Sequence, residues 1–343
     1  RVAMTTFARA TGNPAQEFNS HVTKLARIWG KHGVLMFRDT LSDEIAIIDG
    51  VSRDATQEYG LAIEGSTFKP MALSESLTVS ENPPKLIGRV GYKKHQLFGI
   101  GWSELDDEFT KMVRVQSMPS LSSKPQTFML NQILQLLTLG ETTPCLYDGK
   151  NFFSATHLLD PFSDLGDVAA NQWPNLITQP QTHAGWDAVF QSMTRRPGPG
   201  HLINTDTAAA FLPDRGLTGA NLSIWCGDAA VISQFRKMWK PGSLYAVANG
   251  PETRESYTQA TVQYVPEMFS HDTANASNYV YCVIRNEPEL RGVYCRVPHA
   301  PTITQTGAGS DVEVKTQRRE VMAYQTFGRG FGFPFKIVKW KFS

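Results

Sequence analysis

The chain has 343 residues, a length that corresponds to about two domains. Its 41% hydrophobic and 10% aromatic content is typical of a globular protein and excludes wholesale disorder. Lys and Arg number 33 against 32 Asp and Glu, and the net charge of +1 excludes nucleic-acid binding through charge alone. No apolar run reaches about 18 residues, so we expect no membrane-spanning helix. The chain starts at Arg1 without a signal-peptide pattern, and we expect this start to reflect either trimming or proteolysis.

The first predicted element is a helix over residues 13–30. Asn13 is a suitable N-cap residue, and Pro14 suits the first helical position. Apolar side chains follow at helical spacing, namely Phe18, Val22, Leu25 and Trp29. This apolar face fits either a core helix of the chain's own fold or a helix that docks on a neighbouring subunit.

Residues 60–100 predict a long two-stranded hairpin with a turn at residues 82–84, which read Asn-Pro-Pro. An isolated hairpin is marginal in water, so its apolar side chains need another surface, and we expect a second chain to be able to supply it. The segment "SELDDEF" (residues 103–109) then brings four carboxylates together. Because the Asp-x-Asp-x-Asp-Gly spacing of a calcium loop is absent, we interpret them as a solvated or N-terminal face of a helix. They are Glu104, Asp106, Asp107 and Glu108.

The remaining elements alternate between helix and strand. A helix with a broad apolar face is predicted over residues 125–139, and a second helix begins near residue 182. "NLSIWCG" predicts a buried strand, and the helix that follows it is predicted to be capped by Asp228. Further strands are predicted in "QATVQYVPEMF" and "YVYCVIRN". The tail from residue 311 is predicted to be rich in strands, with a hairpin near residues 318–320.

Motifs of well-known catalytic and cofactor sites are missing from the sequence. It has no phosphate loop, no G-x-S-x-G and no H-E-x-x-H, and "GRGFGF" (residues 328–333) lacks the strand and helix that flank a dinucleotide site. The four cysteines are scattered without a C-x-x-C pair, so we expect reduced thiols rather than a zinc ribbon, redox motif or disulfide scaffold. We therefore predict no cofactor, no metal and no catalytic residue. The cysteines are Cys145, Cys226, Cys282 and Cys295.

The segment "TTPCLYDGKNFFSATHLL" (residues 142–159) allows two interpretations. Its residue types permit a Cys–His catalytic pair, Cys145 with His157, provided that the thiol and the imidazole lie within hydrogen-bond reach. The alternative is a structural hairpin that turns at Asp148 and Gly149 and buries its two phenylalanines, with His157 satisfying a hydrogen bond. No protease signature surrounds Cys145, which favours the hairpin. The structural or interface candidates are therefore Asp148, Gly149, Phe152, Phe153 and His157, together with the apolar face of the first helix.

The stretch "YDGKNFFSATH" (residues 147–157) resembles a segment of Mu-like bacteriophage major head subunits. In that family a D-G turn, an F-F-S and a histidine follow one another in this order and spacing. The order of the elements is similar over most of the chain, whereas the ending "FGRGFGFPFKIVKW" departs from the pattern.

The resemblance implies an α+β protein with the Hong Kong 97 type capsid fold. Residues 1–60 would be an N-terminal arm, 61–100 an extended E-loop, and 101–180 the peripheral P-domain with a spine helix at about 125–139. Residues 181–299 would form the axial A-domain, and 300–343 would return to the P-domain.

The resemblance also implies a function without catalysis. The chain would be a major capsid protein that assembles in the host cytoplasm, as hexamers and pentamers, into an icosahedral phage head around double-stranded DNA. Its partners would be other copies of itself, with portal, scaffold and decoration proteins as further candidates, and no membrane. The alternatives are an encapsulin-like shell that loads protein cargo and a Cys–His hydrolase.

Overall fold

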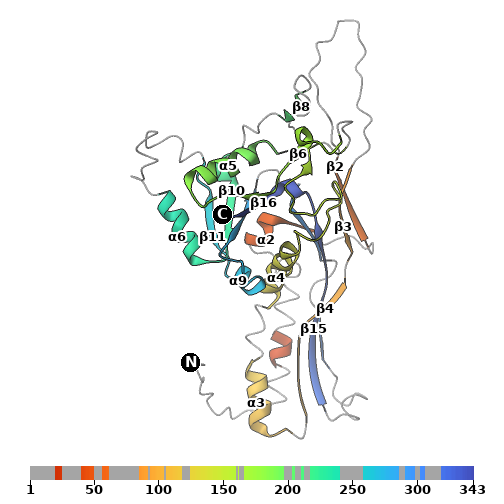
Figure 1. Cartoon of the computed structure of the whole chain (residues 1–343). Helices are drawn as coiled ribbons and strands as arrows, with labels where there is room; N and C mark the ends of the chain where they lie inside the picture. Colours follow the sequence, from red (N-terminus) through yellow and green to blue (C-terminus); the bar gives the residue numbers. More distant parts are fainter. Residues whose placement is uncertain are drawn as a thin grey trace.

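The computed structural model describes a body with a long projecting arm, which is built around residues 93–103 and 318–327 and is not the predicted N-terminal arm (Figure 1). The described residues are 20–24, 40–49, 56–61, 85–91, 93–103, 106–117, 124–159, 161, 166–196, 203–204, 210–211, 217–239, 258–285, 290–297, 302–305 and 318–343. Phe18, Leu25 and Trp29 of the first predicted helix lie outside this part of the chain. Residues 20–24 are helical, and Val22 there is buried within the chain, which favours the core interpretation for this residue.

The first sheet is organised around one strand, β15, which runs from the body along the arm (Figure 1). β15 pairs antiparallel with β13 near its C-terminal end, with β14 in its middle, and with β4 over ten residue pairs. β1 adds to β13 in parallel and brings the N-terminal part of the chain into the sheet. The five strands are β1 (Ala46–Asp49), β4 (Lys93–Ser103), β13 (Val293–Arg296), β14 (Thr302–Gln305) and β15 (Arg318–Phe331).

One sequence prediction is wrong in this sheet. The hairpin near residues 318–320 is not formed, because these residues start β15 and pair with Ser103, Trp102 and Gly101. The hairpin predicted over residues 60–100 lies partly outside the described residues, which omit 62–84; β2 (Thr56–Leu61) and β3 (Lys85–Gly91) pair antiparallel as a separate two-stranded sheet, and β4 pairs with β15. The apolar side chains of β3 find a surface within the chain, because Ile87 and Val90 are buried.

The second sheet forms the body and has the strand order β11-β10-β12-β16-β7. Every residue of β10 and β12 is buried, which explains their nearly unbroken apolar sequences. Two helices predicted from the sequence lie beside this sheet (Figure 1), α5 (His183–Thr194) and α6 (Ala229–Met238). The Asp228 side chain accepts a hydrogen bond from the Ala230 N–H at 2.8 Å, which confirms the predicted cap. The strands are β7 (Leu176–Thr178), β10 (Leu222–Cys226), β11 (Thr261–Tyr264), β12 (Tyr279–Ile284) and β16 (Ile337–Lys341).

Two further helices confirm predictions made from the sequence. The helix predicted over residues 125–139 is α4 (Lys124–Thr138), and its apolar face is buried at Met129, Ile133 and Leu137. The acidic segment starts α3 (Glu108–Ser117), where the Asp107 carboxylate accepts a hydrogen bond from the Thr110 N–H at 2.9 Å. Asp107 therefore serves the helix start, as the N-terminal interpretation predicted, while Glu104 and the Glu108 side chain lie outside the described part of the chain.

Short elements complete the described chain. The strand pairs β5–β6 and β8–β9 are antiparallel, and the Pro266–Asp272 segment contains α9, which packs on α4. No helix in the described ranges is long and apolar enough to cross a membrane. The short elements are α2 (Thr40–Ile45), β5 (His157–Leu158), η3 (Ala169–Asn171), β6 (Gln172–Trp173), β8 (Ile203–Asn204), β9 (Ala210–Phe211), η5 (Gly219–Asn221), α9 (Glu267–His271) and η6 (Pro334–Lys336).

A buried carboxylate attaches the N-terminal segment to the second sheet. Glu44 of α2 is only 8% exposed. It accepts hydrogen bonds from the Trp225 indole N–H at 3.2 Å and the Gln263 amide at 2.9 Å, and the Arg285 guanidinium lies 3.5 Å away. These partners come from β10, β11 and the end of β12, so one side chain joins four segments that are distant in sequence.

We expect Glu44→Ala to lower the free energy of unfolding by roughly 2 to 3 kcal/mol, because it leaves the buried donors of Trp225 and Gln263 without an acceptor. Urea unfolding followed by tryptophan fluorescence measures the change. The control is Glu267→Ala on the half-buried surface of α9, which we expect to cost less than about 0.5 kcal/mol. Equal losses in the two variants would contradict the structural role of Glu44.

Candidate functional site

The candidate site is a tight hairpin that follows α4. Pro144 and Asn151 form an antiparallel bridge, and the Cys145 N–H donates to the Lys150 carbonyl at 2.8 Å. The turn requires a left-handed backbone at Gly149, whose φ is +77°. The sequence Asp-Gly therefore places the Asp148 side chain inside the turn, where it can reach the backbone and the side chains around it.

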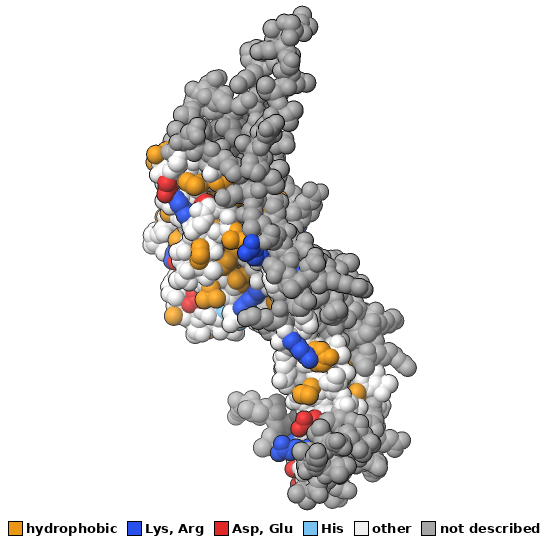
Figure 2. Space-filling model, turned by 90° about the vertical axis from the view of Figure 1, so that its right-hand side faces the viewer, with side chains coloured by type: hydrophobic (Ala, Val, Ile, Leu, Met, Phe, Trp, Pro, Cys, Tyr) orange, Lys and Arg blue, Asp and Glu red, His pale blue; other side chains and the backbone are white. Residues whose placement is uncertain are grey.

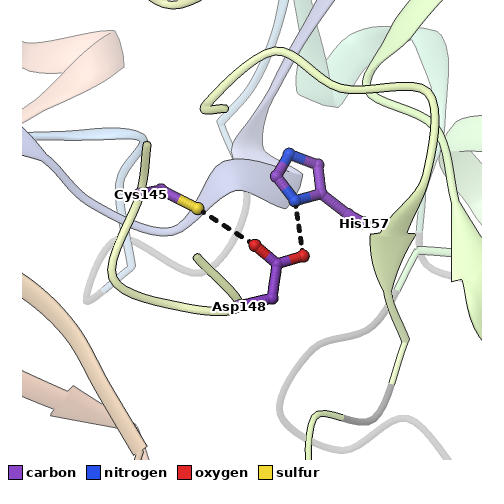
Figure 3. A group of neighbouring side chains, drawn as sticks. All are labelled: Cys145, Asp148 and His157. Carbon is purple, nitrogen blue, oxygen red and sulfur yellow. Dashed lines mark hydrogen bonds and ion pairs between the residues drawn. The ribbon is translucent and has the colours of Figure 1, made fainter. Parts of the chain in front are cut away.

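The Asp148 carboxylate lies at the centre of the site (Figure 3). Its Oδ1 accepts hydrogen bonds from the Lys150 N–H at 3.1 Å and the Cys145 thiol at 3.4 Å. Its Oδ2 accepts from the Leu158 N–H at 2.9 Å and lies 2.8 Å from His157 Nδ1. A carboxylate offers about four acceptor positions, and these four contacts use all of them.

His157 is fully buried and faces an oxygen on both sides of its ring. Nδ1 faces the Asp148 carboxylate, and Nε2 lies 3.0 Å from the Phe152 carbonyl. Since neither oxygen has a proton to give when Asp148 is ionised, both contacts are satisfied when each ring nitrogen carries a proton. The Asp148–His157 contact is therefore a buried hydrogen-bonded pair held by the Phe152 carbonyl on its other side.

The electrostatics of the pair keep Asp148 ionised. Burial acts to raise the pKa of this carboxyl, but the hydrogen bond and charge of His157 and the Leu158 and Lys150 N–H groups outweigh it and lower the pKa to about 2. The same surroundings raise the pKa of the Cys145 thiol instead of lowering it. Burial and the Asp148 charge raise the pKa of Cys145 to about 12, so the sulfur stays protonated.

The site does not have the arrangement of a Cys–His nucleophile. A catalytic pair needs a thiolate with the imidazole as its base, and here both groups make their hydrogen bonds to Asp148 instead (Figure 3). Cys145 is 3% exposed and His157 is fully buried, so a substrate has no access to either. The cluster acts as a closed hydrogen-bonded unit, and among the described residues it is the one group of Cys, Asp and His whose ligand atoms could hold a metal ion.

The two phenylalanines anchor the hairpin in the core. Phe152 stacks on Phe331 with ring centroids 4.2 Å apart, and Phe153 stacks on Tyr281 at 5.6 Å. Both side chains are at most 2% exposed, so they contact their own chain and have no surface to offer to a second copy.

The C-terminal ending that departs from the family pattern packs on this hairpin. Tyr147 lies edge-on to Phe333 and Phe335, and His157 lies 5.7 Å from the Phe335 ring. Close approach explains the glycines between the aromatic residues, because a Cβ on Gly332 would lie 2.5 Å from the Arg291 carbonyl oxygen. The glycine-rich stretch is therefore part of a packed strand end and does not form a nucleotide loop.

Asn175 is a site residue that sequence reasoning missed. Its amide donates to the Phe152 carbonyl at 2.7 Å and the Pro334 carbonyl at 3.0 Å, and its Oδ1 accepts from the Ser154 N–H at 2.8 Å. It thus joins the hairpin to the C-terminal segment. No local signal in "QWPNLIT" marks this role, because its partners are 21 to 159 residues away.

We expect Asp148→Asn to lower the free energy of unfolding by about 3 to 5 kcal/mol, since it takes the buried carboxylate away from His157 and places an amide N–H next to groups that themselves donate. Chemical denaturation of the purified chain measures the loss. Asp167→Asn is the matched control, because Asp167 is 58% exposed and its ion pair with Lys150 is screened by solvent. A loss as small as that of the control would show that Asp148 is not the centre of the hairpin.

The pH dependence follows from the lowered pKa of Asp148. Its folded value of about 2 lies below the ordinary 3.8, so the unfolded chain binds more protons between these values. The stability that Asp148 contributes is fully present above about pH 5 and is lost as the pH falls through 3.8 towards 2. We expect the difference in urea midpoint between the wild type and Asp148→Asn to shrink below about pH 4. A difference that stays constant down to pH 2 would contradict the assignment.

Comparison with known proteins supports the fold at the level of structure. No family model matches the chain, and no curated protein is similar to it in sequence. The chain is similar to a subunit in the structure described as the cyanophage Pam1 capsid asymmetric unit, with a TM-score of 0.52 and 14% identity, over 90% of this chain and 93% of that one. It is also similar to a chain from Mycobacterium phage Patience, with a TM-score of 0.50 and 11% identity, over 99% and 90% of the two chains.

These structural similarities establish the fold, although the sequence identities are only 14% and 11%. Both cover nine-tenths or more of the chain, so they match the body and the arm together. The chain therefore has the α+β Hong Kong 97 type capsid fold, as the resemblance of residues 147–157 implied.

Proposed function

We propose that the chain is a major capsid protein of a tailed bacteriophage, which assembles as hexamers and pentamers into an icosahedral head. The observation that carries this proposal is the likeness to the Pam1 capsid subunit over nearly the full length of both chains. A fold by itself does not fix a function, so the surface and the site of this chain have to agree with it.

The surface of the chain favours contact with other protein chains. Large apolar side chains stand exposed on the described surface, and Figure 2 shows hydrophobic side chains among polar and basic ones on one face. Obligate interfaces bury large apolar areas, and single exposed side chains on several elements supply contacts in several directions. The exposed residues are Phe109, Leu139, Leu146, Val168, Tyr264, Phe269 and Met322.

The site agrees with a protein that carries out no catalysis. Its cysteine is a protonated, buried thiol, and its histidine is held between two oxygens. The hairpin supports the packing of α4, the second sheet and the C-terminal strand on one another. We therefore propose a structural role for Asp148, Gly149, Phe152, Phe153 and His157.

The finer assignments belong to the same proposal. They comprise membership of the Mu-like head subunits and the division into arm (1–60), E-loop (61–100), P-domain (101–180 and 300–343, with α4 as the spine) and A-domain (181–299). The pairing of β1 with β13 means that residues 46–49 of the proposed arm lie in the first sheet. The partners are other copies of the chain, with portal, scaffold and decoration proteins and the enclosed double-stranded DNA, and the place is the virion head after assembly in the host cytoplasm.

Negative-stain electron microscopy of the purified chain, beside light scattering, tests the proposal. We expect closed shells or regular rings of hexamers. A monodisperse monomer or dimer at every salt concentration from low to molar would overturn it. The contents of shells formed in cells separate a phage head, which holds double-stranded DNA, from an encapsulin-like shell, which holds a protein cargo.

We expect Phe153→Ala to lower the yield of particles, because the loss of a buried aromatic ring costs about 3 to 5 kcal/mol of subunit stability. Sedimentation of cell lysates measures particle yield, and urea unfolding measures stability. Phe109→Ala is the control for stability, since Phe109 is 71% exposed and its removal leaves the core intact. Normal particle yield from Phe153→Ala would contradict the anchoring role of Phe153.

A further inference from the structure

The cluster of Cys145, Asp148 and His157 has a property that shell assembly does not use. One ligand atom from each residue, a sulfur, a carboxylate oxygen and a ring nitrogen, lie within 4.8 Å of one another. We propose that this cluster is a binding site for one divalent metal ion of borderline softness, with Zn²⁺ as the matching ion. The inference departs from the sequence-based expectation of no metal and goes beyond the proposed function.

The ligand types select the kind of ion. Zinc sites in proteins combine thiolate, imidazole and carboxylate ligands, whereas calcium and magnesium sites use oxygen alone. All three side chains come from one hairpin and the strand after it, so ordering the hairpin also orders the site. Zinc matches this mixed set of sulfur, nitrogen and oxygen ligands, which it binds with tetrahedral geometry.

The present distances are close to those of a metal-bound arrangement. Tetrahedral bonds of about 2.0 to 2.3 Å place neighbouring ligand atoms about 3.3 to 3.6 Å apart. Cys145 Sγ lies 3.4 Å from Asp148 Oδ1, and His157 Nδ1 lies 2.8 Å from Asp148 Oδ2 (Figure 3). These two contacts go to different carboxylate oxygens, and the three ligand atoms lie within 4.8 Å of one another, so metal binding requires small shifts of the thiol and the imidazole around one ion.

The ligand set balances the charge of the ion. With Zn²⁺ bound, a thiolate, the Asp148 carboxylate and a neutral imidazole give the site a net charge of zero, which matters because a buried site tolerates an uncompensated charge poorly. Because the ligands bind in their deprotonated forms, metal binding releases protons to the solvent.

The surrounding hydrogen bonds fit metal ligands. A ligating histidine usually donates its other ring N–H to a carbonyl or carboxylate, and His157 Nε2 faces the Phe152 carbonyl at 3.0 Å. The Asn175 amide donates to the same carbonyl and fixes its position. The Lys150 and Leu158 N–H groups hold the two oxygens of Asp148. The orientation of both ligands is therefore set by groups that do not need to move.

Entry of the ion requires the turn of the hairpin to open or the metal to bind during folding. Leu146, next to Cys145, is 44% exposed, so the turn lies at the surface although the three ligands are buried. Three protein ligands leave the fourth position of a tetrahedral ion to water, which the opened turn can admit.

Cobalt(II) is the probe for the test, because its absorption reports both thiolate ligation and tetrahedral geometry. The full-length protein is treated with a chelator and then loaded with Co²⁺ in two ways, as folded chain and by refolding in the presence of the ion. We expect one Co²⁺ per chain, a sulfur-to-cobalt charge-transfer band, displacement of the band by Zn²⁺, and a higher unfolding midpoint with metal. Cys145→Ser should abolish the band, whereas Cys295→Ser, which alters a buried thiol outside the cluster, should retain it.

Two results would overturn the proposal. The first is the absence of the band after both loading protocols in wild-type protein whose fold is verified by circular dichroism. The second is a band of equal strength in Cys145→Ser, which would place the ion elsewhere. Neither result bears on shell formation, because electron microscopy of the metal-free protein answers that question separately.

Discussion

The main-chain pairing of β15 is the constraint on which the architecture depends. This strand of 14 residues pairs with β4, β13 and β14, and β1 is attached through β13. Body, arm and N-terminal segment therefore share one hydrogen-bonded sheet. Because a strand at the centre of a sheet satisfies its N–H and C=O groups on both sides, the arm is held in line with the body.

A second constraint comes from burying charge. The Asp148 carboxylate is buried with its four acceptor positions occupied, and His157 lies 2.8 Å from it. An ionised group in this place is tolerated only when every partner is present, so the turn, the strand at His157 and the aromatic C-terminal segment have to form together. In this cluster Cys145 and His157 both bond to Asp148, which leaves Cys145 without a catalytic base. The same three side chains supply the sulfur, oxygen and nitrogen ligands of the proposed metal site.

The aromatic residues of the chain fall into a buried group and an exposed group. Phe152, Phe153 and the aromatic residues near the C-terminus fill the interior, where Phe152 stacks on Phe331 of β15 and Phe153 on Tyr281 of β12, so that the hairpin contacts both sheets. Phe109, Tyr264 and Phe269 stand exposed on separate elements, which suits a subunit whose stability is completed by its neighbours. In such a protein the interior fixes the shape of the subunit, and the exposed side chains are available for contacts between subunits.

The sequence by itself determined the elements whose signals are local. The apolar period and terminal residues of α4 place it at Lys124–Thr138 against a prediction of 125–139, Asp228 caps its helix, and Asp148 with Gly149 turns the hairpin. Only the tertiary structure decided which strands pair, because β4 and β15 are separated by more than 200 residues and strand pattern carries no information about a partner. It also decided the chemistry of the site. The protonation of Cys145 and the ionisation of Asp148 depend on burial and on partners such as Asn175, which no spacing in the sequence reveals.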